Sequence, residues 1–389
     1  MNYKLNYSQW GKQEISAINK VVKSSYLTMG KNVNIFEKQF ARYLGRKYAV
    51  MVNSGSSANL LSLASLFYKK KKPLKVYDEV IVPAIAWSTT YSPLQQYGLK
   101  IKIVDVNLKD LNADIDKILS AITKKTKMIV AVSILGFPAE LKKMRDICKK
   151  KNIYLFEDNC EALGAKIGKK KTGTFGILSS HSFFFSHHIS TIEGGMVTTN
   201  DYELYCLMKS IRAHGWSRDL PTRNNLNLSK KKGLYEQYNF ILPGYNLRST
   251  EISAAIGIEQ LKKLKNMIYI RNKNLKLFQN LFKNDKRFII QKTAYTASSF
   301  SFPMIFKNKV RQKFKLRFFN LLKKNNINFR LITGGCFTEH PYKNYFNYEI
   351  YKNVNNAKKA HKDGFFVGNA SRDLTKEIKK FYKVIKNFK

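Results

Sequence analysis

The chain has 389 residues and a hydrophobic content of 44%, enough for a large and a smaller globular domain, and it lacks the run of about 18 apolar residues that a membrane span requires. Its formal net charge of +44 comes from scattered lysines, often beside asparagine, without a nucleic-acid-binding module, so we expect a solvated surface that attracts anionic substrates and no nucleic-acid partner. The first residues lack the apolar core of a signal peptide and the four cysteines fit no disulfide, zinc or iron–sulfur pattern, which predicts a reduced protein in the cytoplasm.

Short apolar runs bounded by turn signals alternate with helical patterns through the first two-thirds of the chain. The predicted strands are residues 48–52, 79–83, 101–105, 128–133 and 153–157, and the predicted helices are residues 58–68, 114–123 and 139–151. Uniformly apolar strands that alternate with helices are typical of a mostly parallel sheet with helices on both faces. We therefore predict an α/β fold whose functional residues lie beyond the carboxyl ends of the strands.

The pattern changes after residue 250. A long amphipathic stretch at residues 251–282 leads into an apolar segment at residues 288–306 and then into further helical segments. We predict a large domain at residues 1–250, followed at residues 251–389 by a connecting helix and a smaller α+β domain.

One stretch of the chain carries no positive charge. The 37 residues between Lys171 and Lys209 include neither Lys nor Arg, although the average frequency in the chain predicts about seven. We expect this stretch to be buried, or to surround a site from which stray cations are excluded.

Two loops that follow predicted strands carry candidate binding residues. Residues 53–59 (NSGSSAN) open a helix, where backbone N–H groups and hydroxyls suit a phosphate, although a plain serine cap explains the same residues. Trp87 follows the next strand, and its indole is suited to stacking on a planar ring or to simple packing.

Two further segments carry acidic and aromatic candidates. In residues 156–165 (FEDNCEALGA), Asp158 either caps a helix or keeps a heterocyclic nitrogen protonated, which makes the ring a better electron sink. Residues 181–196 (HSFFFSHHISTIEGGM) combine an aromatic run, two adjacent histidines and a diglycine. Adjacent residues seldom bind one metal ion, and no carboxylate completes a metal motif, so we predict no metal here.

Taken in order, these four segments resemble the DegT/DnrJ/EryC1/StrS family of sugar aminotransferases, which belong to the fold-type I pyridoxal phosphate enzymes. The resemblance runs through nearly the whole chain and includes residues 30–37, 123–138, 173–176 and 244–250. It implies the fold of PLP-dependent transferases of fold type I and pyridoxal 5'-phosphate as the cofactor.

The resemblance also implies a role for individual residues. The residues that correspond to those binding the cofactor phosphate are Gly55, Ser56, Ser57 and Ser182. Trp87 is expected to stack on the pyridine face, and Asp158 to pair with its nitrogen. Glu161 stands near the ring hydroxyl, where most family members have Gln. Asn246 is expected to reach the phosphate bound by a neighbouring subunit, which implies a homodimer with shared active sites.

One departure from the family pattern determines the expected chemistry. The family's Schiff-base lysine stands five positions after the serine of its Ser-Phe pair, and counting from Ser182 gives His187 instead. Imidazole does not form that covalent bond, but it moves protons near neutral pH, because its unperturbed pKa is about 6.5. The cofactor is therefore expected to be held non-covalently and to be converted to pyridoxamine 5'-phosphate.

One branch of the family, the sugar 3-dehydratases, carries the same histidine, and residues 187–195 and 364–369 (GFFVGN) resemble that branch. The resemblance implies C3 dehydration of a nucleotide-linked 4-keto-6-deoxyhexose, with glutamate as amino donor and His187 as acid and base, in deoxysugar biosynthesis for a surface polysaccharide such as lipopolysaccharide. Some dehydratases of this branch need an iron–sulfur cluster and a reductase. Others act on a GDP-linked mannose derivative without redox chemistry, and the cysteine spacing favours these.

The substrate contacts and some alternatives stay open at this level. His214, Arg248 and Arg330 are candidate anion contacts for the amino acid or the diphosphate, or else surface and structural residues. The alternatives to a dehydratase are an aminotransferase of the same family that delivers an amine to the sugar, and a catalytically silent relative that binds the cofactor or a nucleotide-sugar.

Overall fold

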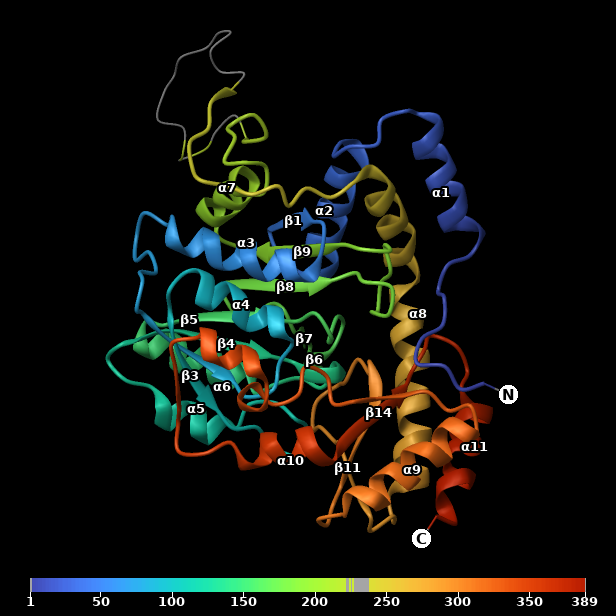
Figure 1. Cartoon of the computed structure of the whole chain (residues 1–389). Coiled ribbons are helices and arrows are strands. Elements are labelled where there is room, and N and C mark those ends of the chain that lie inside the picture. Colours follow the sequence, from blue (N-terminus) through green and yellow to red (C-terminus); the bar gives the residue numbers. More distant parts are fainter. Residues whose placement is uncertain (1, 222–223, 225, 227–237, 389) are drawn as a thin grey trace.

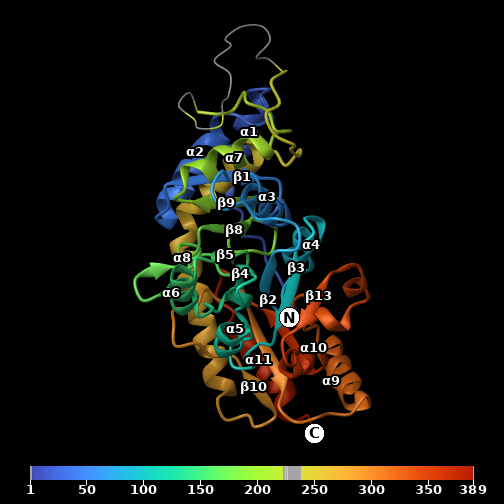
Figure 2. The same ribbon diagram turned by 90° about the vertical axis from the view of Figure 1, so that its left-hand side faces the viewer.

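The computed structural model describes residues 2–221, 224, 226 and 238–388, and at its centre lies an eight-stranded sheet (Figure 1). In order across the sheet, the strands are β1 (Tyr48–Val52), β9 (Gly195–Thr199), β8 (Leu178–Ser182), β5 (Tyr154–Asp158), β4 (Thr126–Val132), β2 (Glu79–Pro83), β3 (Lys100–Val104) and β13 (Tyr348–Ile350). Neighbouring strands are parallel except at β9, which is antiparallel to both β1 and β8. Figure 2 shows the sheet with β1 at the upper end. The prediction of a mostly parallel α/β sheet is confirmed.

The strands form because their residues are β-branched and apolar, and both of their faces are buried. In β2, Val80 and Val82 pack into one hydrophobic cluster, whereas Ile81 between them packs into another on the opposite face. The predicted bounds of β1 and β2 are confirmed, and the other three predicted strands are displaced by only one or two residues.

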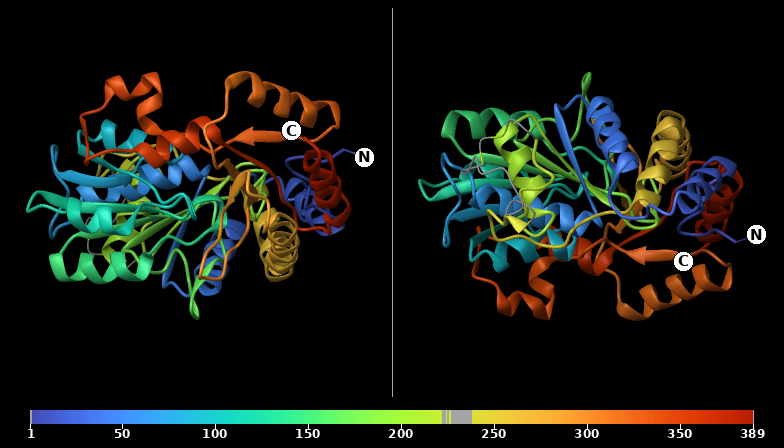
Figure 3. Two further views of the ribbon diagram at one scale, coloured as in Figure 1. Left: turned by 90° about the horizontal axis from the view of Figure 1, so that it is seen from below. Right: turned by 90° about the horizontal axis from the view of Figure 1, so that it is seen from above.

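Helices cover both faces of the sheet, as Figure 3 shows in two views along it. The helices of the first 250 residues that contribute to the first cluster are α3 (Gly55–Phe67), α4 (Ser88–Gln96) and α7 (Tyr202–Ile211). The helices in the clusters on the other face are α2 (Lys31–Leu44), α5 (Ile115–Ala121) and α6 (Leu141–Lys151). This arrangement leaves the carboxyl ends of the parallel strands as the edge at which loops from several strands meet.

The long helix α8 (Glu251–Phe282) has the predicted bounds, and Thr250 caps it by accepting a hydrogen bond of 3.2 Å from the Ser253 amide. Figure 1 shows α8 running down the side of the molecule, from the large sheet to a second, antiparallel sheet. In order, the strands of that sheet are β10 (Phe288–Ile290), β11 (Ser301–Phe306), β14 (Gly364–Gly368) and β12 (Phe329–Leu331).

Aromatic side chains fill the space between this second sheet and its helices. Phe278 of α8 stacks on Phe302 of β11 at a centroid distance of 4.7 Å and an interplanar angle of 9°. The remaining elements of the described ranges are α1 (Lys12–Lys23), α9 (Gln312–Lys324), α10 (Asn355–Asp363), α11 (Thr375–Lys386), β6 (Lys166–Ile167), β7 (Lys170–Lys171), η1 (Ile134–Gly136), η3 (Phe337–Glu339) and η4 (Pro341–Tyr345). None of the helices in these ranges has the length and apolarity needed to cross a lipid bilayer.

Segments on both sides of residue 250 pack against the other predicted domain. β13 lies beyond residue 250 but pairs with β3 of the large sheet. Near the other end, Tyr3 pairs with Ile327, and its hydroxyl donates a hydrogen bond of 2.7 Å to the Gly368 carbonyl. The division of the chain at residue 250 stays a prediction.

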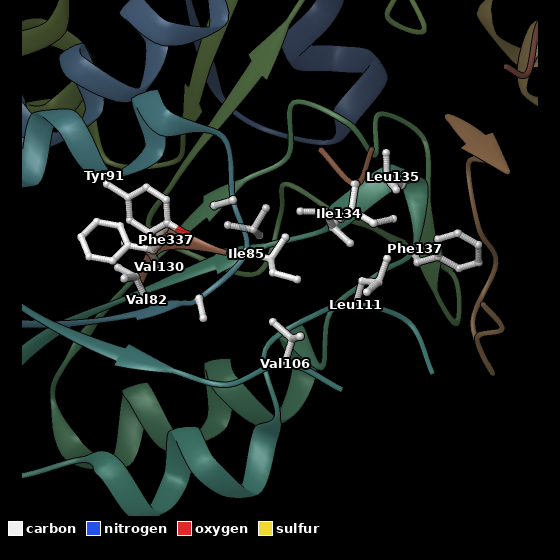
Figure 4. Packing of buried hydrophobic residues seen from close by; sticks show 14 of the residues in the cluster. Val82, Ile85, Tyr91, Val106, Leu111, Val130, Ile134, Leu135, Phe137 and Phe337 are labelled. Atoms are coloured by element: carbon white, nitrogen blue, oxygen red, sulfur yellow. The ribbon is translucent and has the colours of Figure 1, made fainter. Parts of the chain in front are cut away.

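A buried apolar cluster anchors the loops that leave β2 and β4 (Figure 4). The rings of Tyr91 and Phe337 lie 4.9 Å apart, and the Tyr91 hydroxyl donates a hydrogen bond of 2.8 Å to the carbonyl of Pro83. Ile85 and Ile134 belong to the same cluster. The positions of both loops are therefore fixed by the core, and these loops carry residues of the pocket described next.

Candidate active site

A pocket of about 310 Å³ opens where the carboxyl ends of the parallel strands meet. Loops that follow β1, β2, β4, β5 and β8 form its walls, together with the N-terminal segment, β12 and β14. Of the residues selected from the sequence, the pocket brings together Gly55, Ser56, Trp87, Asp158, Glu161, Ser182, His187 and Arg330. These candidate residues thus gather beyond the strand ends, where the sequence predicted a site.

The loop after β1 forms a tight seat at the N-terminus of α3. Ser54 caps the helix by accepting a hydrogen bond of 3.0 Å from the Ser57 amide, and the Ser56 hydroxyl lies 2.8 Å from that of Thr89. A Cβ on Gly55 would lie 2.5 Å from the Cβ of Ser182, so only glycine allows β8 to approach the helix this closely. Helix N–H groups and serine hydroxyls in this arrangement suit a phosphate.

Asp158 is held at the end of β5 by three donors. Its Oδ2 accepts hydrogen bonds from Asn59 Nδ2 at 3.0 Å and from Thr90 Oγ1 at 2.7 Å, and its Oδ1 accepts one from the Cys160 amide at 3.2 Å. The carboxyl group is therefore fixed in orientation and buried in the pocket wall. A carboxylate in this position is suited to hold a protonated ring nitrogen.

Trp87 stands one residue before α4, as the N-cap of that helix. Its side chain lines the pocket and is 55% exposed, in contrast to the buried Ala84, Ile85 and Ala86 before it. An indole that the core leaves exposed at a pocket provides a flat surface for a planar ligand.

Glu161 is a buried acid three residues beyond Asp158. Its Oε2 accepts a hydrogen bond of 2.8 Å from the Leu135 amide, and its Oε1 accepts one of 3.0 Å from the Thr333 hydroxyl. Burial raises the pKa of Glu161 to about 7, and the nearby charge of Asp158 acts in the same direction. Glu161 therefore exists in both protonation states near neutral pH.

His187 lies in the loop between β8 and β9. Its ring lines the pocket and stands edge-on to that of Phe300, at a centroid distance of 5.1 Å and an angle of 72°. Its Nδ1 lies 3.5 Å from the Ser186 hydroxyl. Burial, and secondly the charge of Arg271, lower the pKa of His187 to about 3, so the imidazole is neutral at pH 7. No lysine is among the described residues that line the pocket.

Four residues selected from the sequence do not line this pocket: Ser57, His214, Asn246 and Arg248. Ser57 lies one turn into α3 and contributes through its bond to Ser54. His214 and Asn246 are exposed, and Arg248 Nε donates a hydrogen bond of 3.1 Å to Asn246 Oδ1. His214, Asn246 and Arg248 therefore lie outside the pocket of their own subunit.

Sequence reasoning missed several residues that the structure places at the pocket: Leu5, Asn6, Phe300, Thr333 and Phe366. Phe366 lies within the segment GFFVGN, which was recognised as a family signal but not as a pocket wall. The others belong to no motif, and they reach the pocket from the N-terminal segment and from residues 300 and 333, which are distant in the sequence from the strand-end loops.

A wider groove of about 1010 Å³ lies between α1, α2 and α8. It is open to solvent, and none of the residues selected from the sequence line it. The smaller pocket is therefore the candidate active site, because it alone among the described cavities combines the phosphate seat, the fixed carboxylate and the imidazole.

The pocket suits a phosphorylated pyridine. The seat at α3, the fixed carboxyl group of Asp158 and the exposed indole of Trp87 match the phosphate, the ring nitrogen and the ring face of pyridoxal 5'-phosphate. Because no lysine is found among the described residues of the wall, the residues that line it would hold such a group by non-covalent contacts.

Comparisons with known proteins agree with this geometry. The sequence profile of the DegT/DnrJ/EryC1/StrS aminotransferase family matches residues 8–384. The chain is 45% identical to a GDP-4-keto-6-deoxy-D-mannose 3-dehydratase of Yersinia pseudotuberculosis, over 99% of this chain and 98% of the relative. Its structure is similar to that of the Escherichia coli enzyme of this name with bound hydrated PLP, with a TM-score of 0.96, 44% identity and 99% of each chain covered. A dehydratase structure with a trapped PLP-glutamate geminal diamine gives the same TM-score and identity, covering 98% of this chain and 100% of the other.

Proposed function

Because the chain belongs to the DegT/DnrJ/EryC1/StrS aminotransferase family, we propose that it is a pyridoxal phosphate-dependent lyase that removes the C3 hydroxyl of GDP-4-keto-6-deoxymannose, with glutamate as amino donor. The product is the corresponding 3,6-dideoxy-4-keto sugar, a precursor for a surface polysaccharide. The observation that carries this proposal is His187, an imidazole in a pocket wall in which no lysine is found among the described residues.

When bound, the amine form of the cofactor would supply an amino group for the C4 ketone and a ring that stores the electron pair released on deprotonation of the carbon bearing that amine, and that returns the pair to the sugar as the C3 hydroxyl leaves. We assign the phosphate to Gly55, Ser56 and Ser182, the ring nitrogen to Asp158 and the ring face to Trp87. The three hydrogen bonds to Asp158 keep its carboxyl group in one orientation, so the nitrogen stays protonated while charge accumulates in the ring.

His187 has the properties of a group that first accepts and then donates one proton. Its low pKa keeps the ring neutral at pH 7, so a ring nitrogen is free to accept a proton, and it makes the resulting imidazolium a strong acid for the later donation. With Nδ1 beside the Ser186 hydroxyl, Nε2 is the nitrogen we assign to the transfer. The proton that Nε2 takes up is passed to the C3 hydroxyl, which leaves as water.

Glu161 and Arg330 occupy different parts of the pocket. With a pKa of about 7, Glu161 holds or releases a proton beside the assigned position of the cofactor hydroxyl. Arg330 is the only cation among the described lining residues, and we assign it to an anionic group of glutamate or of the diphosphate.

We also propose that the enzyme is a homodimer with shared active sites. Asn246 is exposed and joined to Arg248, outside the pocket of its own subunit, so a second copy can receive both side chains. The test mixes two inactive variants, H187N and N246A. Random exchange restores about a quarter of the native sites if the sites are shared, and no activity returns if each subunit is complete.

We place the reaction in the cytoplasm. All four cysteines are free, which fits a reducing compartment, and the net charge of +44 favours encounters with anionic nucleotide-sugars.

The experiment that tests the proposed function supplies the purified protein with pyridoxal phosphate, glutamate and GDP-4-keto-6-deoxymannose. We expect one 2-oxoglutarate and one ammonia for each sugar, and a sugar product one oxygen lighter than the substrate by mass spectrometry. A sugar that has gained an amine would identify an aminotransferase. Cofactor binding without turnover on a panel of nucleotide-sugars would identify a silent relative.

A further inference from the structure

Arg271 is a buried cation in the middle of α8, behind the two adjacent histidines. It is 2% exposed, and its Nη1 donates to three backbone carbonyls: Ser299 at 3.5 Å, Phe300 at 3.2 Å and Asn369 at 3.2 Å. Among the described residues it forms no ion pair with a carboxylate, and its Nε is buried without a hydrogen-bond partner. Burial lowers the pKa of Arg271 to about 10, so the guanidinium keeps its charge at neutral pH. A buried charge without a counter-ion is costly, which points to a function for it.

Two of the three carbonyls that Arg271 binds belong to Ser299 and Phe300, in the segment 298–300 that contacts both histidines. The Ser298 carbonyl accepts a hydrogen bond of 2.9 Å from His188 Nε2. The ring of Phe300 meets the ring of His187 edge-on at 5.1 Å. Any movement of this segment therefore changes the position of the imidazole in the pocket.

The other side of the segment is fixed by η1. The amides of Ser298 and Phe300 donate to the carbonyls of Gly136 at 2.9 Å and of Leu135 at 3.1 Å. A Cβ on Gly136 would lie 1.9 Å from the Ser298 carbonyl oxygen, and the residue has a φ of +92°, so glycine is required for this contact.

Asn369 joins Arg271 to the same segment. Its Nδ2 donates to the Arg271 carbonyl at 3.0 Å and to the Ser299 hydroxyl at 3.0 Å. Asn369 is the last residue of GFFVGN, so this sequence signal ends in a residue that holds the buried arginine in place.

We propose that Arg271 is a positioning residue for His187: it holds residues 298–300 against the imidazole and, as a buried cation without a carboxylate partner among the described residues, it favours the neutral form of the ring. The proposal rests on the proposed function, in which His187 is the acid and base. It goes further, because it explains why the imidazolium gives up its proton readily to the leaving hydroxyl.

Several other titratable groups lie in the loop of His187 or line the same pocket. Besides Arg271 from α8, they are His188 in its own loop and, around the pocket, Asp158, Cys160, Glu161, Glu193 and Arg330. The charge of Arg271 is the main charge that lowers the pKa values of both His187 and His188, after burial. No carboxylate among the described residues forms an ion pair with either histidine ring, so the cation behind them is not offset there.

This arrangement accounts for the second of the two proton transfers, the donation to the C3 hydroxyl. A cation behind the ring makes the imidazolium unfavourable, so a proton taken up at Nε2 is readily given to the C3 hydroxyl. The hydroxyl departs as water with that proton, and the imidazole returns to its neutral state. No proton from solvent is needed for the departure.

The test follows the protonation of His187 directly, by NMR of protein labelled with ¹³C at histidine Cε1. The chain has six histidines, and the His187 signal is the one lost in H187N. The variants are R271M, which removes the charge and keeps the aliphatic stem, and R271K, which keeps the charge. In case R271M does not fold, S299D supplies a carboxylate beside the intact Arg271. Thermal melting and binding of pyridoxamine phosphate establish that each variant is folded.

We expect the midpoint of the His187 titration to rise by about one pH unit, a tenfold gain in proton affinity, in R271M or S299D. The midpoint stays near the native value in R271K. In R271M and S299D, the acid limb of the pH profile of kcat/KM for dehydration also moves to higher pH. An unchanged His187 titration in a folded R271M or S299D protein would overturn the proposal. The NMR titration needs no substrate, so it tests Arg271 independently of the reaction. If the native protein catalyses no dehydration but the His187 titration still shifts in R271M or S299D, the proposed function is contradicted and the assignment of Arg271 stands.

Discussion

The side-chain amide of Gln9 donates a hydrogen bond of 3.0 Å to the backbone carbonyl of His187, although the two residues lie 178 positions apart. The neighbouring Trp10 makes a second bond of the same kind, from its indole N–H to the Ser190 carbonyl at 3.0 Å. The N-terminal segment thus fastens the loop that carries the imidazole.

We expect Q9A to lower turnover several-fold and to lower the free energy of unfolding by about 1 kcal/mol, the typical contribution of one such hydrogen bond. Steady-state kinetics and thermal melting measure both quantities. Q13A is the matched control, because Gln13 is exposed and contacts only Lys263. Equal kinetics in Q9A and Q13A would show that the loop does not depend on this contact.

Glu161 makes stability depend on pH. Its folded pKa of about 7 lies above the ordinary value of 4.5, so between these values the folded state binds more protons than the unfolded state. The contribution of Glu161 to stability is therefore lost as the pH rises from about 5 to about 8. In E161Q this loss is absent, so the melting temperature of E161Q relative to native protein should increase over that range. A difference that stays constant with pH would contradict the raised pKa.

The close approach of α3 and β8 predicts the effect of G55A. The added methyl group would meet Ser182 at 2.5 Å, so the helix N-terminus has to move and the phosphate seat is distorted. We expect the Kd for pyridoxamine phosphate to rise by about tenfold or more, which is about 1.4 kcal/mol, as measured by absorbance titration. G11A is the control, since the nearest atom to its methyl group is the end of the Gln13 side chain at 3.2 Å, and the side chains of Glu14 and Lys263 lie at 3.8 Å. Native affinity in G55A would exclude the seat as the phosphate site.

Arg330 is exposed at the pocket, where it can bind an anionic group of a substrate. We expect R330A to raise the KM for the nucleotide-sugar or for glutamate by about tenfold or more, as for the loss of a charge-assisted hydrogen bond, with a smaller effect on the other substrate. R311A removes an exposed arginine outside the pocket and provides the control. If R330A leaves the KM values for both substrates unchanged, Arg330 binds neither substrate and is a surface residue.

Much of the fold could be predicted from local patterns. The strands β1 and β2 and the helix α8 have the predicted bounds, because uniform apolar runs and a long amphipathic period are signals contained within one segment. The strands β8 and β9 were not predicted individually, although burial was expected in their lysine-free stretch and is confirmed for both. Their residues are mostly Ser, His, Thr and Gly, and they become strands by pairing with β5 and β1, which lie far away in the sequence.

The pocket residues at the ends of strands could be predicted from the sequence. The pocket residues that come from segments distant in the sequence could not. Asp158 is the last residue of β5 and Trp87 lies in the loop that follows β2, so their position at the strand ends followed from the alternation of elements. Thr333 and Phe300 come from segments joined to the pocket only by tertiary contacts. In the sequence, Arg271 resembles any other charged residue of an amphipathic helix. In the structure it is buried, because the backbone carbonyls of residues 299, 300 and 369 accept its hydrogen bonds.

The most direct test of the central assignment compares H187N with native protein in a single turnover, using protein loaded with pyridoxamine phosphate and GDP-4-keto-6-deoxymannose. We expect H187N to bind both ligands with nearly native affinity and to lose the C3 oxygen at least about 100-fold more slowly, as for the removal of a general acid and base. Formation of the deoxygenated sugar by H187N at the native rate would contradict the assignment of proton transfer to His187.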